Sequence, residues 1–235
     1  MSNVGVLYGL GVGPGDPELI TVKAFRMLKE CPVIAYPKKL RGSKSYAQRI
    51  VDVYINPTEK EMVGLVFPMT KDEDVLNREW RKSVEEIYGY LAEGKDVAFV
   101  TEGDPMLFST FIHLMKLMQE LYPEVPIETI PGISSFNGSA NRLGIPLADG
   151  DEHVAMIPAH EDMDAMRKAI EDHDAIVFIK VAKVMDEMLA LLKEMNLYDR
   201  AHVVTKVTSD EEIIWQLDDL AGAELNYLSC MVVRK

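Results

Sequence analysis

The sequence has little cysteine, no long apolar run and far fewer basic than acidic residues. Its two cysteines, Cys31 and Cys230, cannot form a disulfide framework or a CxxC metal pair, so we expect a reduced, cytoplasmic setting. No stretch reaches the roughly 18–20 uncharged apolar residues that a membrane span requires. The N-terminal stretch has no basic segment before its apolar residues, so we expect neither a secretion signal nor a membrane partner.

The charge balance argues against nucleic acid as a partner. The 235 residues include 25 Lys and Arg against 38 Asp and Glu, which gives a formal net charge of −13. Such a surface repels a phosphate backbone. Hydrophobic residues make up 48% of the chain, which is typical of a folded protein and not of a disordered acidic one. A local basic patch can still bind an anionic small molecule.

Apolar runs of strand length alternate with amphipathic stretches of helix length, which predicts βαβ units and an α/β fold. The strands expected in the first half are residues 4–12, 33–36, 62–67 and 97–101, with helices at 18–29, 45–53, 74–91 and 106–121. The second half adds strands at 127–130, 153–157, 175–181, 201–207, 212–216 and 225–233, with helices at 134–143, 162–172 and 184–195.

Two prolines, Pro123 and Pro126, interrupt this alternation, because they cannot both continue a helix. We therefore expect two α/β domains, residues 1–124 and 125–235. The last strands follow one another without intervening helices. The first domain should therefore contain a mostly parallel sheet and the second a mixed one.

Loops rich in glycine and proline follow three of the expected strands. The first, GLGVGPGDP at residues 9–17, fits neither the GxGxxG dinucleotide pattern nor the GxxxxGK[ST] phosphate loop. Its prolines remove amide donors, so it is a rigid turn that is either purely structural or lets a ligand approach the backbone closely. Like the first loop, EGDP at 102–105 and IPGISS at 130–135 each lie between the end of an expected strand and the start of an expected helix. The carboxyl ends of neighbouring parallel strands meet at one edge, where open α/β sheets bind ligands.

Three segments, GVGPGDPELIT, VTEGDPMLFSTF and IPGISSF, together resemble the tetrapyrrole methylase family over essentially the whole chain. The resemblance implies a homodimer of two-domain chains, with S-adenosylmethionine bound in the cleft between the domains as methyl donor. The segments AYP, GSKSYA, LVFPM and RLGIPLADGDE resemble the branch that methylates carbon 20 of precorrin-2 or cobalt-factor II in cobalamin biosynthesis. Uroporphyrinogen methylases typically read GGDP where this chain has EGDP.

The resemblance also implies which residues contact the cofactor, mostly through backbone groups. They are Pro14, Glu102, Gly103, Asp104, Leu107, Ser134 and Ser135, with looser matches at Ile157, Lys180 and Thr208. Three of these side chains have a structural alternative. Asp104 could cap a helix that starts at Pro105, and the two serines could cap the helix that follows them.

A tetrapyrrole of this class carries a ring of carboxylates, which lysine and arginine recognise. Residues 37–49 contain five basic and no acidic residues. We expect four of these basic side chains to bind the carboxylates, and the hydroxyl groups of a serine and a tyrosine to add hydrogen bonds. These residues are Lys38, Lys39, Arg41 and Lys44, followed by Ser45 and Tyr46. The alternative is a solvated basic loop.

No two of the five histidines have HxxH or HExxH spacing, so we expect no protein-bound metal, and cobalt only within the substrate. The sequence does not identify a catalytic base; His160 is a candidate. Cobalt-containing and metal-free substrates share these motifs, and the absence of an oxygen-handling environment favours the cobalt form. Uroporphyrinogen-III methylation is a further alternative, and a non-catalytic sensor of cofactor or tetrapyrrole is one from a different class.

Overall fold

The computed structural model describes residues 4–39, 42–43, 45–68, 70 and 72–235. Contacts along the chain divide it into two units, Met1–Ser134 and Ser135–Lys235. Each unit has its own sheet of five strands and its own buried core. Among the described residues, no helix is both long enough and apolar enough to cross a membrane.

The sheet of the first unit is entirely parallel, with the strand order β3-β2-β4-β1-β5. Its strands are β1 (Leu7–Gly11), β2 (Val33–Lys38), β3 (Glu61–Val66), β4 (Val97–Thr101) and β5 (Ile127–Ile130). Its helices are α1 (Val22–Glu30), α2 (Tyr46–Val51), α3 (Glu73–Ala92) and α4 (Phe111–Leu121), with a short 3₁₀ turn, η1 (Pro17–Leu19).

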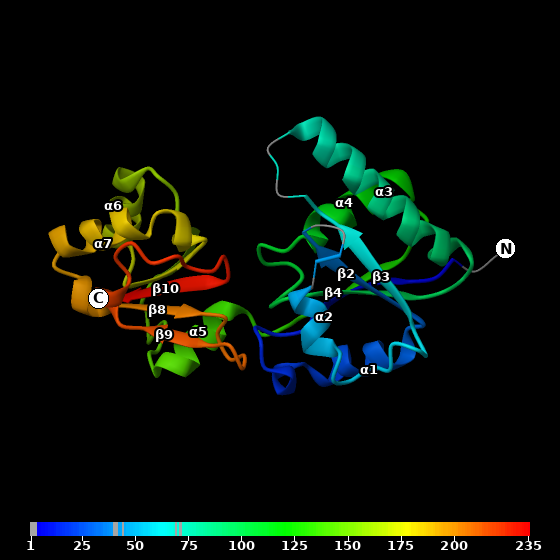
Figure 1. Cartoon of the computed structure of the whole chain (residues 1–235), viewed down its shortest axis with the longest axis horizontal. Coiled ribbons are helices and arrows are strands. Elements are labelled where there is room, and N and C mark those ends of the chain that lie inside the picture. The colour runs from blue at the N-terminus through cyan, green and yellow to red at the C-terminus, as the bar shows by residue number, and fades with distance from the viewer. Residues whose placement is uncertain (1–3, 40–41, 44, 69, 71) are drawn as a thin grey trace. The chain divides into compact units, whose positions relative to one another are not determined.

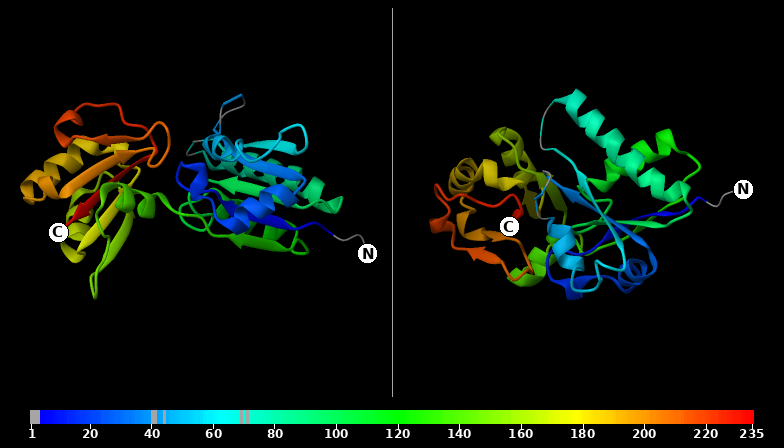
Figure 2. Two further views of the ribbon diagram at one scale, coloured as in Figure 1. Left: turned by 90° about the horizontal axis from the view of Figure 1, so that it is seen from below. Right: turned by 45° about the vertical axis from the view of Figure 1, so that its right-hand side comes forward.

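Helices cover both faces of this sheet (Figure 1). Alternate residues of β4 point to opposite faces: Ala98 and Val100 pack with α1 and α2, whereas Val97 and Phe99 pack with α3 and α4. The right-hand view of Figure 2 shows the same arrangement of two helical layers around the strands. Both faces of the sheet are therefore apolar, which accounts for the continuous hydrophobic runs of its strands.

The second unit has a mixed sheet with the order β6-β7-β10-β8-β9. Its strands are β6 (Val154–Pro158), β7 (Ala175–Ile179), β8 (Ala201–Thr205), β9 (Ile213–Trp215) and β10 (Ser229–Arg234). Its helices are α5 (Ser135–Leu143), α6 (Met163–Asp172) and α7 (Met185–Glu194), with 3₁₀ turns η2 (Val181–Lys183), η3 (Tyr198–Arg200) and η4 (Leu217–Asp219). Figure 1 shows α6 and α7 on one side of the sheet and α5 on the other.

These observations confirm the α/β fold with one parallel and one mixed sheet. The junction expected at residue 124 is wrong by one strand, because β5 belongs to the first sheet and not to the second. Strand β5 follows the two prolines, yet it pairs in parallel with β1 in the first sheet, Leu7 opposite Ile127. The prolines end a helix but do not end a domain, because a loop there can return the chain to the same sheet. The division between the two units falls ten residues later, after Ser134.

Candidate active site

The backbones of the three glycine-rich loops touch one another at the carboxyl ends of β1, β4 and β5. A Cβ atom added to Gly132 would lie 2.0 Å from the carbonyl oxygen of Gly103, and one added to Gly11 would lie 2.6 Å from the same oxygen. The amide of Gly103 also donates to the carbonyl of Gly13 at 2.8 Å. Only residues without a side chain permit this approach. The structure thus brings the three loops to one edge of the first sheet, as the sequence indicated.

The carboxylate of Asp104 ties two of these loops together. One oxygen accepts a hydrogen bond from the amide of Gly132 at 3.0 Å, and the other accepts from the amide of Met106 at 2.8 Å. The side chain is half-buried. Asp104 therefore holds the loop after β4 against the loop after β5, a role that the sequence did not reveal. Each oxygen keeps a second lone pair that can accept a hydrogen bond from a ligand.

The helix after this loop begins later than expected, at Phe111 instead of residue 106. Ser109 accepts a hydrogen bond from the amide of Phe111 and shares one with Thr101 at the end of β4. Phe111 itself is fully buried and lies directly over Gly9, where a Cβ would be 2.3 Å from its ring. Consequently Asp104 does not cap a helix at Pro105, and the half-buried Leu107 lies in the loop.

Glu102 connects the loop after β4 to the basic segment. Its carboxylate accepts hydrogen bonds from its own amide and from the amide of Ala47 in α2, and it feels the charge of Lys39. Burial raises the pKa of this carboxyl, while the two amides and the lysine act in the opposite direction. Glu102, a predicted cofactor residue, thus contacts the predicted substrate-binding segment.

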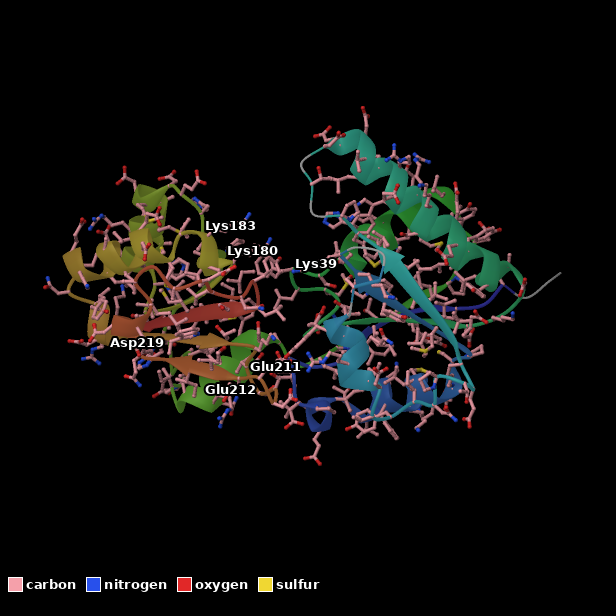
Figure 3. The ribbon with its side chains drawn as sticks, in the orientation of Figure 1. Lys39, Lys180, Lys183, Glu211, Glu212 and Asp219 are labelled. Carbon is pink, nitrogen blue, oxygen red and sulfur yellow. The ribbon has the colours of Figure 1, made fainter. Side chains whose placement is uncertain are left out.

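Only part of the basic segment can be described, since Arg41 and Lys44 lie outside the described residues. Lys38 ends β2; its ammonium is 5.2 Å from the centroid of the Tyr36 ring, and its side chain crosses Gly64 of β3. Lys39 is exposed at the same edge of the sheet, and Figure 3 shows its position.

Ser45 and Tyr46 begin α2, and both have structural roles. Ser45 is buried, and its hydroxyl caps the helix by accepting from the amide of Gln48 at 3.3 Å. Tyr46 packs against the core cluster between the sheet and the first two helices. These contacts favour a role for the two residues in placing the basic segment at the edge of the sheet.

Among the remaining residues predicted in the first unit, Pro14 is buried in the loop after β1, and Ser134 is buried in the loop after β5. Ser135 is the first residue of α5 and belongs to the second unit. Its hydroxyl lies 3.5 Å from the sulfur of Cys230, the second residue of β10. Burial raises the pKa of the Cys230 thiol, so the group is an inert neighbour of Ser135 and not a nucleophile.

The predicted residues of the second unit gather at one edge of its sheet. The strand register places Pro158 beside Ile179, Ile179 beside Cys230, and Ser229 beside Thr205, so the ends of β6, β7 and β8 meet the start of β10. Ile157 lies at the end of β6. Lys180 and Thr208 lie in the loops that follow β7 and β8. We call this the second-unit edge.

Two residues hold the loop at Thr208, which has a left-handed backbone with φ of 68°. The amide of Thr208 donates to Glu212 at 2.6 Å, and Arg142 of α5 donates to both oxygens of Glu212 at 2.5–2.9 Å. The Arg142 guanidinium holds the pKa of the Glu212 carboxyl below its ordinary value. These residues lie 70 positions apart, so no local pattern in the sequence could have revealed the pair.

His160 is exposed in the loop after β6, where its Nδ1 accepts from the amide of Asp162 at 3.3 Å. This bond engages the lone pair of Nδ1, and the role of His160 as a base stays a prediction. Across the part of the chain that is described, no three His, Cys, Asp or Glu side chains lie close enough to hold a metal ion.

Comparison with known proteins gives matches along nearly the whole chain. The model of the family described as "Tetrapyrrole (Corrin/Porphyrin) Methylases" matches residues 6–221. A probable cobalt-precorrin-2 C(20)-methyltransferase of Methanocaldococcus jannaschii is 37% identical over 231 residues, which cover 97% of this chain and 96% of that protein. The cobalt-precorrin-2 C(20)-methyltransferase of Salmonella typhimurium is 32% identical, with 98% and 97% covered. The precorrin-2 C(20)-methyltransferase of a Sinorhizobium species is 31% identical, with 99% and 97% covered.

Solved structures have the same fold. A cobalt precorrin-4 methyltransferase superposes with a TM-score of 0.74 at 21% identity, covering 97% of this chain and 94% of the other. A uroporphyrin-III C-methyltransferase from Thermus thermophilus, solved with S-adenosyl homocysteine, superposes with a TM-score of 0.65 at 21% identity, covering 98% of both chains. At this level of identity the likeness concerns the fold alone.

Proposed function

This chain belongs to the tetrapyrrole (corrin/porphyrin) methylase family of S-adenosylmethionine-dependent C-methyltransferases, and we propose that it methylates carbon 20 of a precorrin-2 macrocycle in cobalamin biosynthesis. The observation that carries the proposal is similarity over the full length. Three relatives named for this reaction are 31–37% identical to this chain, and each alignment covers at least 96% of both proteins.

The glycine contacts of the first unit fit a bound S-adenosylmethionine. Gly11, Gly103 and Gly132 leave no room for side chains, so backbone groups line this edge and a ligand can approach them closely. We propose that this edge binds the cofactor through these loops and through Asp104. The cofactor contacts that the resemblance implies at Ser135, Ile157 and Thr208 stay predictions. S-adenosylmethionine supplies the methyl group.

The main task of the protein in this reaction is to position the methyl donor and the substrate. Methyl transfer from a sulfonium is an in-line displacement, and reacting atoms held about 3–3.5 Å apart in the right orientation can account for several kcal/mol of the barrier. The rigid contacts among the three glycine loops suit this task, because they leave the cofactor site little freedom to move. Lys38 and Lys39 lie at the same sheet edge and would orient the carboxylates of the macrocycle.

We further propose that the substrate is the cobalt-containing form. The relatives named for cobalt-precorrin-2 are 37% and 32% identical, and the relative named for metal-free precorrin-2 is 31% identical. The cobalt would be part of the substrate. The absence of a protein-bound metal and the homodimer stay predictions, which metal analysis and light scattering of the purified protein would test.

The experiment compares the two substrates side by side. The purified protein is incubated anaerobically with S-adenosylmethionine and either metal-free precorrin-2 or its cobalt form, and the products are analysed by mass spectrometry. We expect a gain of one CH₂ unit, faster with the cobalt form, and NMR should locate the new methyl at carbon 20. Bound macrocycle without any mass gain would favour the sensor instead, and a methyl at another carbon would refute the assigned position.

A further inference from the structure

We propose that Lys180 and Lys183, at the second-unit edge, bind carboxylate groups of the anionic macrocycle. The inference rests on the proposed function for the identity of the substrate. It reassigns Lys180, which the resemblance had matched to the cofactor, and adds Lys183, which lies in none of the motifs that carry the resemblance.

The turn after β7 is built to expose these two lysines. Val181 is fully buried and Val184 is 3% exposed, so both anchor the turn in the core of the second unit. Lys180 and Lys183 alternate with these anchors and are exposed. Lys180 directly precedes the 3₁₀ turn η2, and Lys183 is its last residue. Figure 3 shows both side chains leaving the same side of the turn.

The two ammonium groups also lack partners among the residues that the structure describes. Within the described ranges, neither lysine makes a hydrogen bond, an ion pair or a ring contact. Between Asp174 and Asp186 the chain carries no acidic residue, and Asp186 accepts from the amide of Gly222. By contrast, Lys206 at the same edge is paired with Glu211. The turn therefore presents two uncompensated positive charges, which suits an anionic ligand.

The backbone at Lys180 supports a role for its side chain. Its φ of 58° and ψ of 20° lie in the left-handed region, which glycine adopts without cost and a lysine does not. Strained backbone of this kind tends to occur at ligand sites. A lysine here thus places a charged side chain where a glycine would serve the turn better.

The test measures substrate and cofactor binding separately. In the double variant K180E/K183E we expect the KM for the macrocycle to rise about tenfold, which corresponds to about 1.4 kcal/mol. The Kd for S-adenosylmethionine should stay within twofold of the wild type. K168E is the matched control: Lys168 is an exposed lysine on α6 whose substitution should change neither constant. A weaker cofactor Kd with unchanged KM would overturn the proposal.

Two additions keep the test decisive. K180G removes the charge and relieves the backbone, so it should raise the melting temperature while still weakening macrocycle binding; unchanged macrocycle binding by folded K180G would refute the role of Lys180. Binding of uroporphyrin, a macrocycle with eight carboxylates, can be followed by its fluorescence without any turnover. Lysine-dependent binding of uroporphyrin by a protein that methylates neither precorrin-2 form would uphold this inference and refute the proposed function. Uroporphyrin binding equal in wild type and double variant would overturn the inference.

Discussion

Replacing Gly132 by alanine tests whether close contact between the loops builds the candidate cofactor site. The added Cβ would lie 2.0 Å from the carbonyl oxygen of Gly103 and 2.7 Å from backbone atoms of Gly11. Both neighbours are backbone atoms, so no side chain can rotate away to make room. The loop after β5 must therefore move away from the other two, and the hydrogen bond from the Gly132 amide to Asp104 should weaken or break.

The expected cost follows from the size of this clash. Overpacking in a well-packed region typically costs 1–3 kcal/mol, and a contact this short belongs at the upper end, about 3 kcal/mol. For a chain of this size, 1 kcal/mol shifts the melting temperature by about 2–4 °C, so we expect a fall of about 6–12 °C. Because the three loops separate, the Kd for S-adenosylmethionine should rise at least about tenfold.

The matched control is Gly89→Ala. Gly89 lies on the exposed side of α3, and a Cβ there would meet nothing within 4 Å. Alanine is a better helix former than glycine by about 0.5–1 kcal/mol, so this variant should melt about 1–4 °C higher than the wild type. Thermal unfolding and titration calorimetry measure both quantities. A Gly132→Ala protein with the melting temperature and cofactor affinity of the wild type would refute this reasoning.

Three further predictions concern charged groups. Asp104→Ala removes two hydrogen bonds to a charged acceptor, so urea unfolding should show a loss of about 2 kcal/mol and calorimetry weaker S-adenosylmethionine binding; unchanged stability would contradict the tie between the loops. Arg142→Ala removes the partner that lowers the pKa of Glu212. A lowered pKa stabilises the fold above the ordinary value of 4.5, and this stability is lost as the pH falls through the folded value. The wild type should therefore lose its advantage over Arg142→Ala in acid, and an advantage independent of pH would contradict the ion pair. The effect of Glu102→Gln on stability has the opposite sign, because burial raises the pKa of Glu102 and destabilises its charged form. This variant should gain stability at neutral pH relative to the wild type, and the gain should disappear below pH 4.5, the ordinary value; a gain that persists there would argue against the raised pKa.

The residues implied by the resemblance differ in how the structure places them. Pro14, Gly103 and Asp104 lie in loops that the strand order brings to one edge of the sheet, and parallel pairing explains why position along the chain was enough to predict this. The role of Asp104 was harder to predict. Its spacing suggests a local helix cap, but its carboxylate reaches Gly132, 28 residues away.

The sequence by itself determined the alternation of strands and helices, the mixed character of the second sheet and the three turns that need glycine. Each of these depends on local chemistry, namely the period of apolar residues and the steric freedom of the backbone. Only the tertiary structure placed β5 in the first sheet, joined Arg142 to Glu212 and showed two exposed lysines at η2 that have no partner among the described residues. These features depend on which distant residues pack together, and no local pattern records that choice.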